Sequence, residues 1–267
     1  MYIHDKNDLK NYVIKYIICL LPLYIYGFYK NGILLFTSDY VSFIGMFKVF
    51  YLPFLSVTAY FITNKILKEN FNVDLLFLSL FIIPLFVPSN INLLLYFVVN
   101  FIFLLLRKFY NPALIITILS LLGTFPSSID NPSIYSFTSW DLLWGRNIGG
   151  IASTSIILGL IIFIILSLIN DHKYLVSISG LLAFTLLSII FKEYFLLTSG
   201  NAILTLLFIA NIPNKSPLLK KNMLIYGILV GALGFILSLF VSPYYGMVLS
   251  VFLISTIYKL LNLKKCI

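Results

Sequence analysis

Side chains that could take part in chemistry gather in one polar segment of an otherwise apolar chain, residues 126–147. The segment is rich in Ser, Thr and Asp and holds both tryptophans. Two adjacent hydroxyls, Thr138 and Ser139, are flanked by the rings of Phe137 and Trp140. This arrangement suits a flat aromatic ligand, which would stack on the rings. The alternative is an ordinary belt of aromatic residues at the membrane surface.

Acidic residues are absent from the middle of every apolar run. Charged groups inside a membrane are costly and mark ion or proton pathways, so no carboxylate is expected to carry a proton or sodium ion at mid-membrane. All nine acids lie at run ends or in loops: Asp5, Asp8, Asp39, Glu69, Asp74, Asp130, Asp141, Asp171 and Glu193. The polar groups inside the runs are neutral and most often serve helix packing: Asn100, Ser153, Thr154, Ser155, Thr205 and Asn211.

Metal and disulfide chemistry are not expected. The two cysteines, Cys19 and Cys266, form neither a CxxC pair nor a disulfide framework, and four thiolates for an iron–sulfur cluster are missing. The two histidines, His4 and His172, lie beside charged residues. We expect them to be solvated near the membrane surface, so no metal site is predicted.

The composition indicates an integral membrane protein. Of the 267 residues, 61% are apolar and 10% are charged, whereas soluble domains are about 45–50% apolar and about 25% charged. Such a chain cannot cover a water-exposed surface. The net charge of +9 therefore suits lipid headgroups and the cytoplasm, and nucleic-acid binding is excluded.

Ten apolar runs predict an all-α polytopic protein of the cell membrane, with about ten transmembrane helices and both termini in the cytoplasm. The polar N-terminus precedes a run without a cleavage site, which predicts an uncleaved first span. With the N-terminus inside, 14 of the 18 Lys and Arg residues fall inside, Lys48 is undecided, and Lys30, Arg146 and Lys192 fall outside. The runs lie near residues 12–28, 45–63, 73–88, 91–106, 112–125, 148–169, 174–191, 200–212, 222–242 and 245–262.

Several runs are short for a crossing of about 20 residues, which predicts some tilted, broken or re-entrant helices. Residues 29–48 are too long for a turn and too interrupted for a span. We expect this segment to be a half-inserted helix, with Asp39 and Lys48 at the outer interface.

The proline pattern recurs after about half the chain: Pro84 as Pro213, Pro88 as Pro217 and Pro112 as Pro243. With five spans in each half, the second copy must be upside down. Residues 1–267 are therefore predicted to form one transmembrane domain of two inverted half-repeats, approximately 12–125 and 148–262, joined by an outer loop. Inverted repeats usually carry broken helices and a binding site near the midplane.

Three motifs follow one another in a characteristic order. Asn-Pro-Ala stands at residues 111–113, Gly-Gly-Ile-Ala-Ser-Thr-Ser at 149–155, and Ala-Asn-Ile-Pro with a later Ser-Pro at 210–217. Over roughly residues 12–262, this order resembles the RnfD/NqrB family, the flavin-carrying membrane components of the Rnf and sodium-translocating NADH:quinone oxidoreductase complexes.

The resemblance implies a cofactor, FMN, held at the outer face. The family attaches FMN by a phosphoester to the last residue of Ser-Gly-Ala-Thr, and residues 136–139 read Ser-Phe-Thr-Ser here. Ser139 is then the expected attachment point and Thr138 the second choice, with Asn111, Gly149 and Gly150 shaping the backbone around the cofactor.

The resemblance also implies what this chain lacks. The family's Glu in the sixth span is Ser153 here, and the family's Asp before the proline of the third motif is Ile212. If those acids move cations in the family, this chain has lost them.

Three functions stay open at this stage. The first is a subunit, not a stand-alone enzyme, of an ion-translocating redox complex that holds a flavin and has other membrane subunits and the lipid bilayer as partners. The second is a cofactor-free small-solute permease or channel on the same scaffold. The third is a structural subunit without a cofactor of its own.

Overall fold

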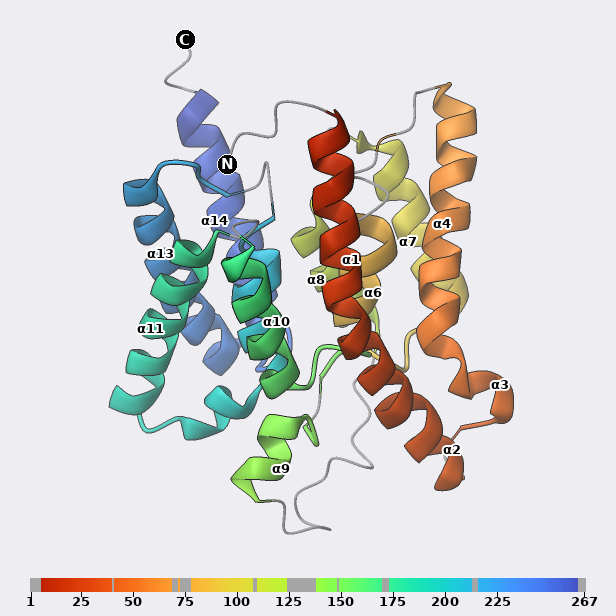
Figure 1. Ribbon diagram of the computed structural model, residues 1–267, viewed down its shortest axis with the longest axis horizontal. Coiled ribbons are helices and arrows are strands. Elements are labelled where there is room, and N and C mark those ends of the chain that lie inside the picture. Colours follow the sequence, from red (N-terminus) through yellow and green to blue (C-terminus); the bar gives the residue numbers. More distant parts are fainter. Residues whose placement is uncertain are drawn as a thin grey trace.

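The computed structural model describes residues 6–39, 41–68, 72, 78–107, 110–123, 138–147, 149–169, 173–212 and 216–263. The regular elements of this part of the chain are all helices, as the sequence predicts. Figure 1 shows them side by side, most of them running between the upper and lower ends of the molecule. The first residues of α1 and the last residues of α14 lie at the same, upper end.

The elements before the loop are α1 (Lys6–Phe28), η1 (Tyr29–Leu34), α2 (Leu35–Thr37), α3 (Phe43–Met46), α4 (Lys48–Leu67), η2 (Leu78–Ile82), α6 (Ile83–Phe86), α7 (Leu93–Leu105) and α8 (Pro112–Leu122). Those after it are α9 (Ser139–Trp144), α10 (Ile156–Leu168), α11 (Tyr174–Ile190), η4 (Tyr194–Thr198), α12 (Gly200–Leu204), η5 (Thr205–Ile209), α13 (Lys220–Phe240) and α14 (Gly246–Leu263). The order of elements is alike on the two sides of the loop. In each, two helices of 13 or more residues (α1 and α4, then α10 and α11) are followed by a short helix with a π-turn, which is η2 with α6 before the loop and α12 with η5 after it. The division into inverted repeats stays a prediction.

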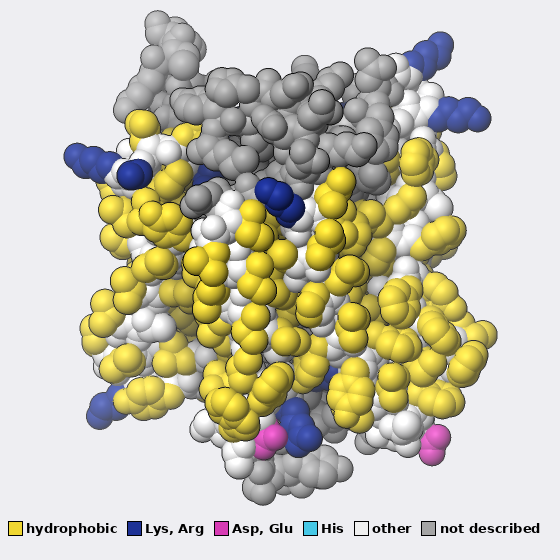
Figure 2. Space-filling model, viewed as in Figure 1, with side chains coloured by type: hydrophobic (Ala, Val, Ile, Leu, Met, Phe, Trp, Pro, Cys, Tyr) yellow, Lys and Arg dark blue, Asp and Glu magenta, His cyan; other side chains and the backbone are white. Residues whose placement is uncertain are grey.

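The surface matches a membrane environment. Figure 2 shows hydrophobic side chains as a broad band around the middle, with Lys and Arg side chains at the two ends. Two helical stretches are long and apolar enough to cross a membrane by themselves, residues 13–37 and Lys220–Phe240. Six shorter apolar helical stretches among the described residues have 10–17 residues, and a helix of 13 residues rises only about 20 Å. The number of crossings and the cytoplasmic placement of the termini stay predictions.

The first apolar run predicts a helix that ends near residue 28, and this prediction is wrong. The helix continues through the wide π-turn η1 and through α2 to Thr37, so the first part of segment 29–48 is helical and belongs to the first crossing. The π-turn buries Lys30 and Gly32, and Gly32 lies against the backbone of Met46. The chain then turns at Asp39, which has a φ of 59°.

The most extensive helix pair, α11 and α13, is held together by small residues. A Cβ atom at Gly227 would meet the carbonyl oxygen of Val176 at 2.5 Å, and one at Gly231 would overlap the carbonyl oxygen of Gly180. Close backbone approach through glycine supplies van der Waals contact where lipid removes the hydrophobic driving force between helices.

The predicted orientation can be tested with single cysteines in a chain that carries Cys19→Ser and Cys266→Ser. Ser38 is exposed between α2 and α3, and Lys221 is exposed at the start of α13, at the opposite end. We expect a membrane-impermeant maleimide to label Ser38→Cys in intact cells and to label Lys221→Cys only after lysis. Labelling in the reverse order would contradict the cytoplasmic termini.

Candidate functional site

Two short helices end at the centre of the protein. The first, η2 with α6, ends at Phe86 and continues as extended chain from Val87. The second, α12 with η5, ends at Ile209, and residues 210–212 leave it as buried non-helical backbone. The described residues of each helix span about 14–15 Å, roughly half of the hydrocarbon thickness. The broken helices expected from the short apolar runs are therefore present.

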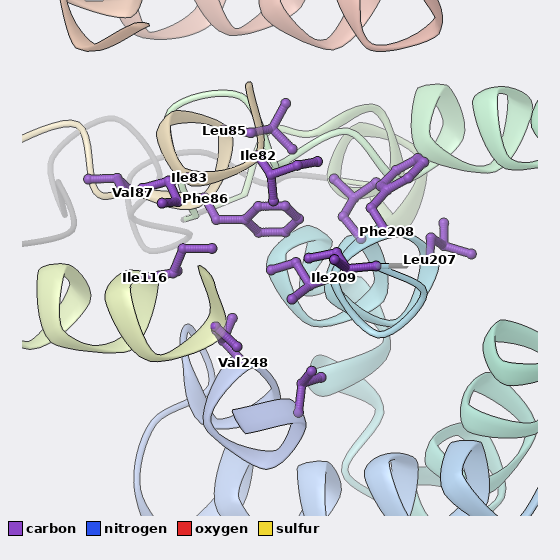
Figure 3. Close-up of a cluster of buried hydrophobic side chains, with 14 of the residues drawn as sticks. Ile82, Ile83, Leu85, Phe86, Val87, Ile116, Leu207, Phe208, Ile209 and Val248 are labelled. Carbon is purple, nitrogen blue, oxygen red and sulfur yellow. The ribbon is translucent and has the colours of Figure 1, made fainter. Parts of the chain in front are cut away.

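The two short helices meet through apolar side chains. Figure 3 shows Ile82, Ile83 and Phe86 on one side and Phe208 and Ile209 on the other. Ile116 of α8 and Val248 of α14 close the cluster. All of these side chains are buried, so the contact is an apolar seal. A solute that crossed the protein here would have to push these buried apolar side chains apart.

The end of the first short helix is capped by backbone. The amides of Ile151 and Ala152 donate to the carbonyl oxygens of Val87 and Leu85, at 2.8 and 3.0 Å. Residues 149–155, expected to open the sixth span, are therefore a non-helical segment with a bend at residues 151–152, which we call the crossing segment, and the helix α10 begins only at Ile156.

Glycines let the crossing segment lie against its neighbours. A Cβ atom at Gly150 would meet the Phe86 carbonyl oxygen at 2.6 Å, and one at Gly27 of α1 would meet the Ile151 carbonyl oxygen at 2.6 Å. Gly200 lies equally close to the Thr154 carbonyl group. Gly149 and Gly150, predicted to shape a cofactor site, are both buried in this crossing.

The end of the second short helix is capped by side chains. The amide of Asn211 donates to the carbonyl oxygen of Leu207 at 2.7 Å and to the Ser177 hydroxyl. Ser177 in turn donates to the carbonyl oxygen of Leu206 at 3.0 Å. Asn211, expected to serve helix packing, thus satisfies carbonyl groups that the break in the helix would leave without partners.

A second polar cluster joins the crossing segment to α12. The Ser153 hydroxyl donates to the Asn201 side-chain oxygen, and the Asn201 amide donates to the carbonyl oxygen of Tyr244. The hydroxyl of Thr205 donates to the Asn201 carbonyl oxygen at 2.7 Å. Sequence reasoning missed Asn201, although its place beside a run of apolar residues is the signal that singled out Asn211. This cluster is neutral and buried.

The predicted attachment residues lie at the lower end in Figure 1, on the short helix α9. Thr138 is the N-cap of α9: its hydroxyl donates to Asp141 Oδ2 at 2.7 Å and accepts from the Asp141 amide at 3.3 Å. Ser139 is exposed, and its hydroxyl makes no hydrogen bond with the described residues. Ser136 and Phe137 lie outside the described residues.

The aromatic residues of α9 are available to a ligand or to lipid. Trp140 and Trp144 are 63% and 40% exposed and meet edge to face, with ring centroids 6.5 Å apart. Trp140 follows Ser139 directly, as the stacking prediction requires.

The carboxylate of Asp141 takes part in the N-terminal cap of α9. The hydrogen bonds from the Thr138 hydroxyl and amide, together with Arg146 at 3.4 Å, hold the pKa of Asp141 below its ordinary value. The ionised form is therefore the one that caps the helix. Its contribution is present above the ordinary pKa and is lost as the pH falls through the lowered one.

Asn111 lies apart from α9. It caps α8, where its side-chain oxygen accepts from the Ala113 amide at 3.1 Å and its amide donates to Ser255 of α14 at 3.3 Å. The main contacts of α9 are with α10 and η4, whereas those of α8 are with α14, α7 and α6. The five residues predicted for one cofactor site thus occupy three places: α9, the crossing segment and the start of α8.

At the opposite end of the protein, Lys173 fixes the chain that follows the second short helix. Its ammonium group donates to the Ser216 hydroxyl at 2.8 Å and carbonyl oxygen at 3.2 Å. Burial lowers the pKa of Lys173 to about 8 from 10.5. Because the folded state binds this proton more weakly than the unfolded chain, the contribution of Lys173 to stability rises with pH between those values. Among the described residues, no three His, Cys, Asp or Glu side chains come together as a metal site requires.

The family model described as the NQR2, RnfD, RnfE family matches residues 1–264. No curated protein matches the chain.

The side-chain cap on the second short helix predicts a measurable loss of stability. We expect Asn211→Leu to lower the free energy of unfolding by about 1–3 kcal/mol, because the Leu207 carbonyl group loses its donor in a buried site. Unfolding of the purified chain by SDS, followed by circular dichroism, measures this loss. The control is Asn222→Leu on α13, whose amide makes no hydrogen bond with described residues; equal losses in both variants would contradict the capping role.

Proposed function

Because the match over residues 1–264 shows that the chain belongs to the NQR2, RnfD, RnfE family, we propose that it is a membrane subunit of an ion-translocating electron-transfer complex of the Rnf or Nqr kind. The family is membrane-integral, and its members belong to multi-subunit membrane redox complexes. This membership over almost the whole chain is the observation that carries the proposal. The cell's cytoplasmic membrane is the proposed location, and other membrane subunits are the proposed partners.

We further propose that the outer helix α9 carries FMN on Ser139. The Ser139 hydroxyl is exposed and makes no hydrogen bond with the described residues, whereas the Thr138 hydroxyl is engaged twice by Asp141. A phosphoester on Thr138 would remove the cap of α9, while one on Ser139 would leave the cap in place. FMN, when bound, supplies electron transfer between partner groups.

The other residues of α9 suit this role. Trp140 offers an exposed ring beside the attachment hydroxyl, and an isoalloxazine ring can stack on such a surface. Asn111 is not proposed to hold the flavin, because it contacts α14.

The apolar seal argues against the permease alternative. A small polar solute would need polar groups along its path, whereas Phe86 lies beside Ile82 and Ile209 at the centre, among other buried apolar side chains. A structural subunit without a cofactor remains the competing function, and the flavin experiment separates the two.

The test is expression of the full chain with and without a flavin transferase, followed by a denaturing gel viewed under ultraviolet light. We expect a fluorescent band with the transferase in the unmodified chain and in Thr138→Ala, and no fluorescence in Ser139→Ala. Thr138→Ala is the matched control, because it removes a neighbouring hydroxyl and costs the helix cap about 1 kcal/mol. Dark bands in every lane would reject the covalent flavin and favour the structural subunit.

A further inference from the structure

A buried lysine lies at the outer end of α1. Lys30 is only 6% exposed, although a buried ammonium group inside a membrane protein is costly unless it is well satisfied. It occupies the π-turn η1, and its ammonium group donates to the carbonyl oxygen of Asn147. Asn147 is itself buried and belongs to the stretch that returns from α9 to the crossing segment.

The next residue of the π-turn makes a parallel contact. The amide of Asn31 donates to the carbonyl oxygen of Ile151 at 2.6 Å. Two successive side chains of η1 therefore bond to main-chain carbonyl groups four residues apart in the stretch after α9. The Asn147 amide adds a bond to the carbonyl oxygen of Thr198, at the end of η4.

The turn that leaves α9 is also held against α1. Gly145 has a φ of +108°, and a Cβ atom there would lie 2.8 Å from the ring of Tyr26. The left-handed backbone and this close approach both require glycine. The stretch 145–151 is thus fixed by α1 at three points, which are Tyr26, Lys30 and Asn31.

The helix α9 is too short to be stable without contacts to the rest of the protein. It has six residues, about 9 Å of helix, and isolated helices of this length are not stable in water. Its position must come from the stretch that follows it and from its contacts with α10 and η4.

We infer that Lys30 and Asn31 are positioning residues, which fix α9, and with it Ser139, at the outer end of the protein. The placement of a flavin by these residues rests on the proposed function; the placement of α9 does not. Both are distinct from the residues that would touch a cofactor, because they act through the carbonyl groups of Asn147 and Ile151.

The tryptophans supply a direct measurement of this inference. The chain has two tryptophans, Trp140 and Trp144, and both lie in α9, so the intrinsic tryptophan emission reports on that helix alone. In the purified full chain without flavin, we expect Lys30→Met to shift the emission to longer wavelength and to increase quenching by acrylamide. Lys30→Arg, which keeps a donor cation, should restore the unmodified spectrum.

Lys192→Met is the matched control, since Lys192 is an exposed lysine just after α11, in the part of the chain that leads to η4. If Lys30→Met fails to fold, as judged by circular dichroism, Asn31→Leu carries the test and should give the same shift. An unchanged spectrum in the folded variant, or an equal shift in Lys192→Met, would overturn the inference.

The flavin gel run on the same variants separates the two proposals. A tryptophan shift with no flavin on the unmodified chain would leave the positioning role intact and reject the proposed attachment. Flavin on the unmodified chain, with an unchanged tryptophan spectrum in Lys30→Met, would support the attachment and reject the positioning role.

Discussion

A broken helix inside a membrane must find partners for the backbone groups it releases, because hydrocarbon offers none. This protein breaks two helices at its centre, after Phe86 and after Ile209. The first break is satisfied by the amides of the crossing segment, and the second by the side chains of Asn211 and Ser177. The arrangement of the surrounding helices follows from these requirements, since the crossing segment needs room beside α1, α6 and α12.

The position of α9 depends on the same crossing segment. The backbone amides of Ile151 and Ala152 bind the crossing segment to α6, and Lys30 and Asn31 of η1 hold the chain between α9 and α10 from the other side. The candidate attachment residue at the surface and the apolar seal at the centre are therefore connected through one continuous stretch of backbone. This stretch belongs to the motif that carried the family resemblance.

The sequence predicted the class, the apolar runs and the presence of broken helices, because lipid imposes a strong demand on composition and run length. It did not reveal that residues 149–155 are non-helical, since small residues at a helix start and in an irregular segment look alike until the partner backbone is known. It placed Asn111 with Ser139 because a motif order carries no distance; the structure joins Asn111 to Ser255. Lys30 was assigned to the outer side by the alternation of the apolar runs, but its burial depends on a π-turn that the apolar run does not encode.

The two caps differ in how they respond to mutation over evolutionary time. A cap made of main-chain amides does not depend on the chemical type of the side chains at 151 and 152, as long as neither becomes proline and the close-packed glycines at 27, 150 and 200 remain. The second break depends on the carboxamide of Asn211, which a single amino-acid exchange can remove. The second break is therefore the more sensitive of the two to exchange of a side chain, and we expect an amide or hydroxyl donor to be retained there after the surrounding apolar residues have changed.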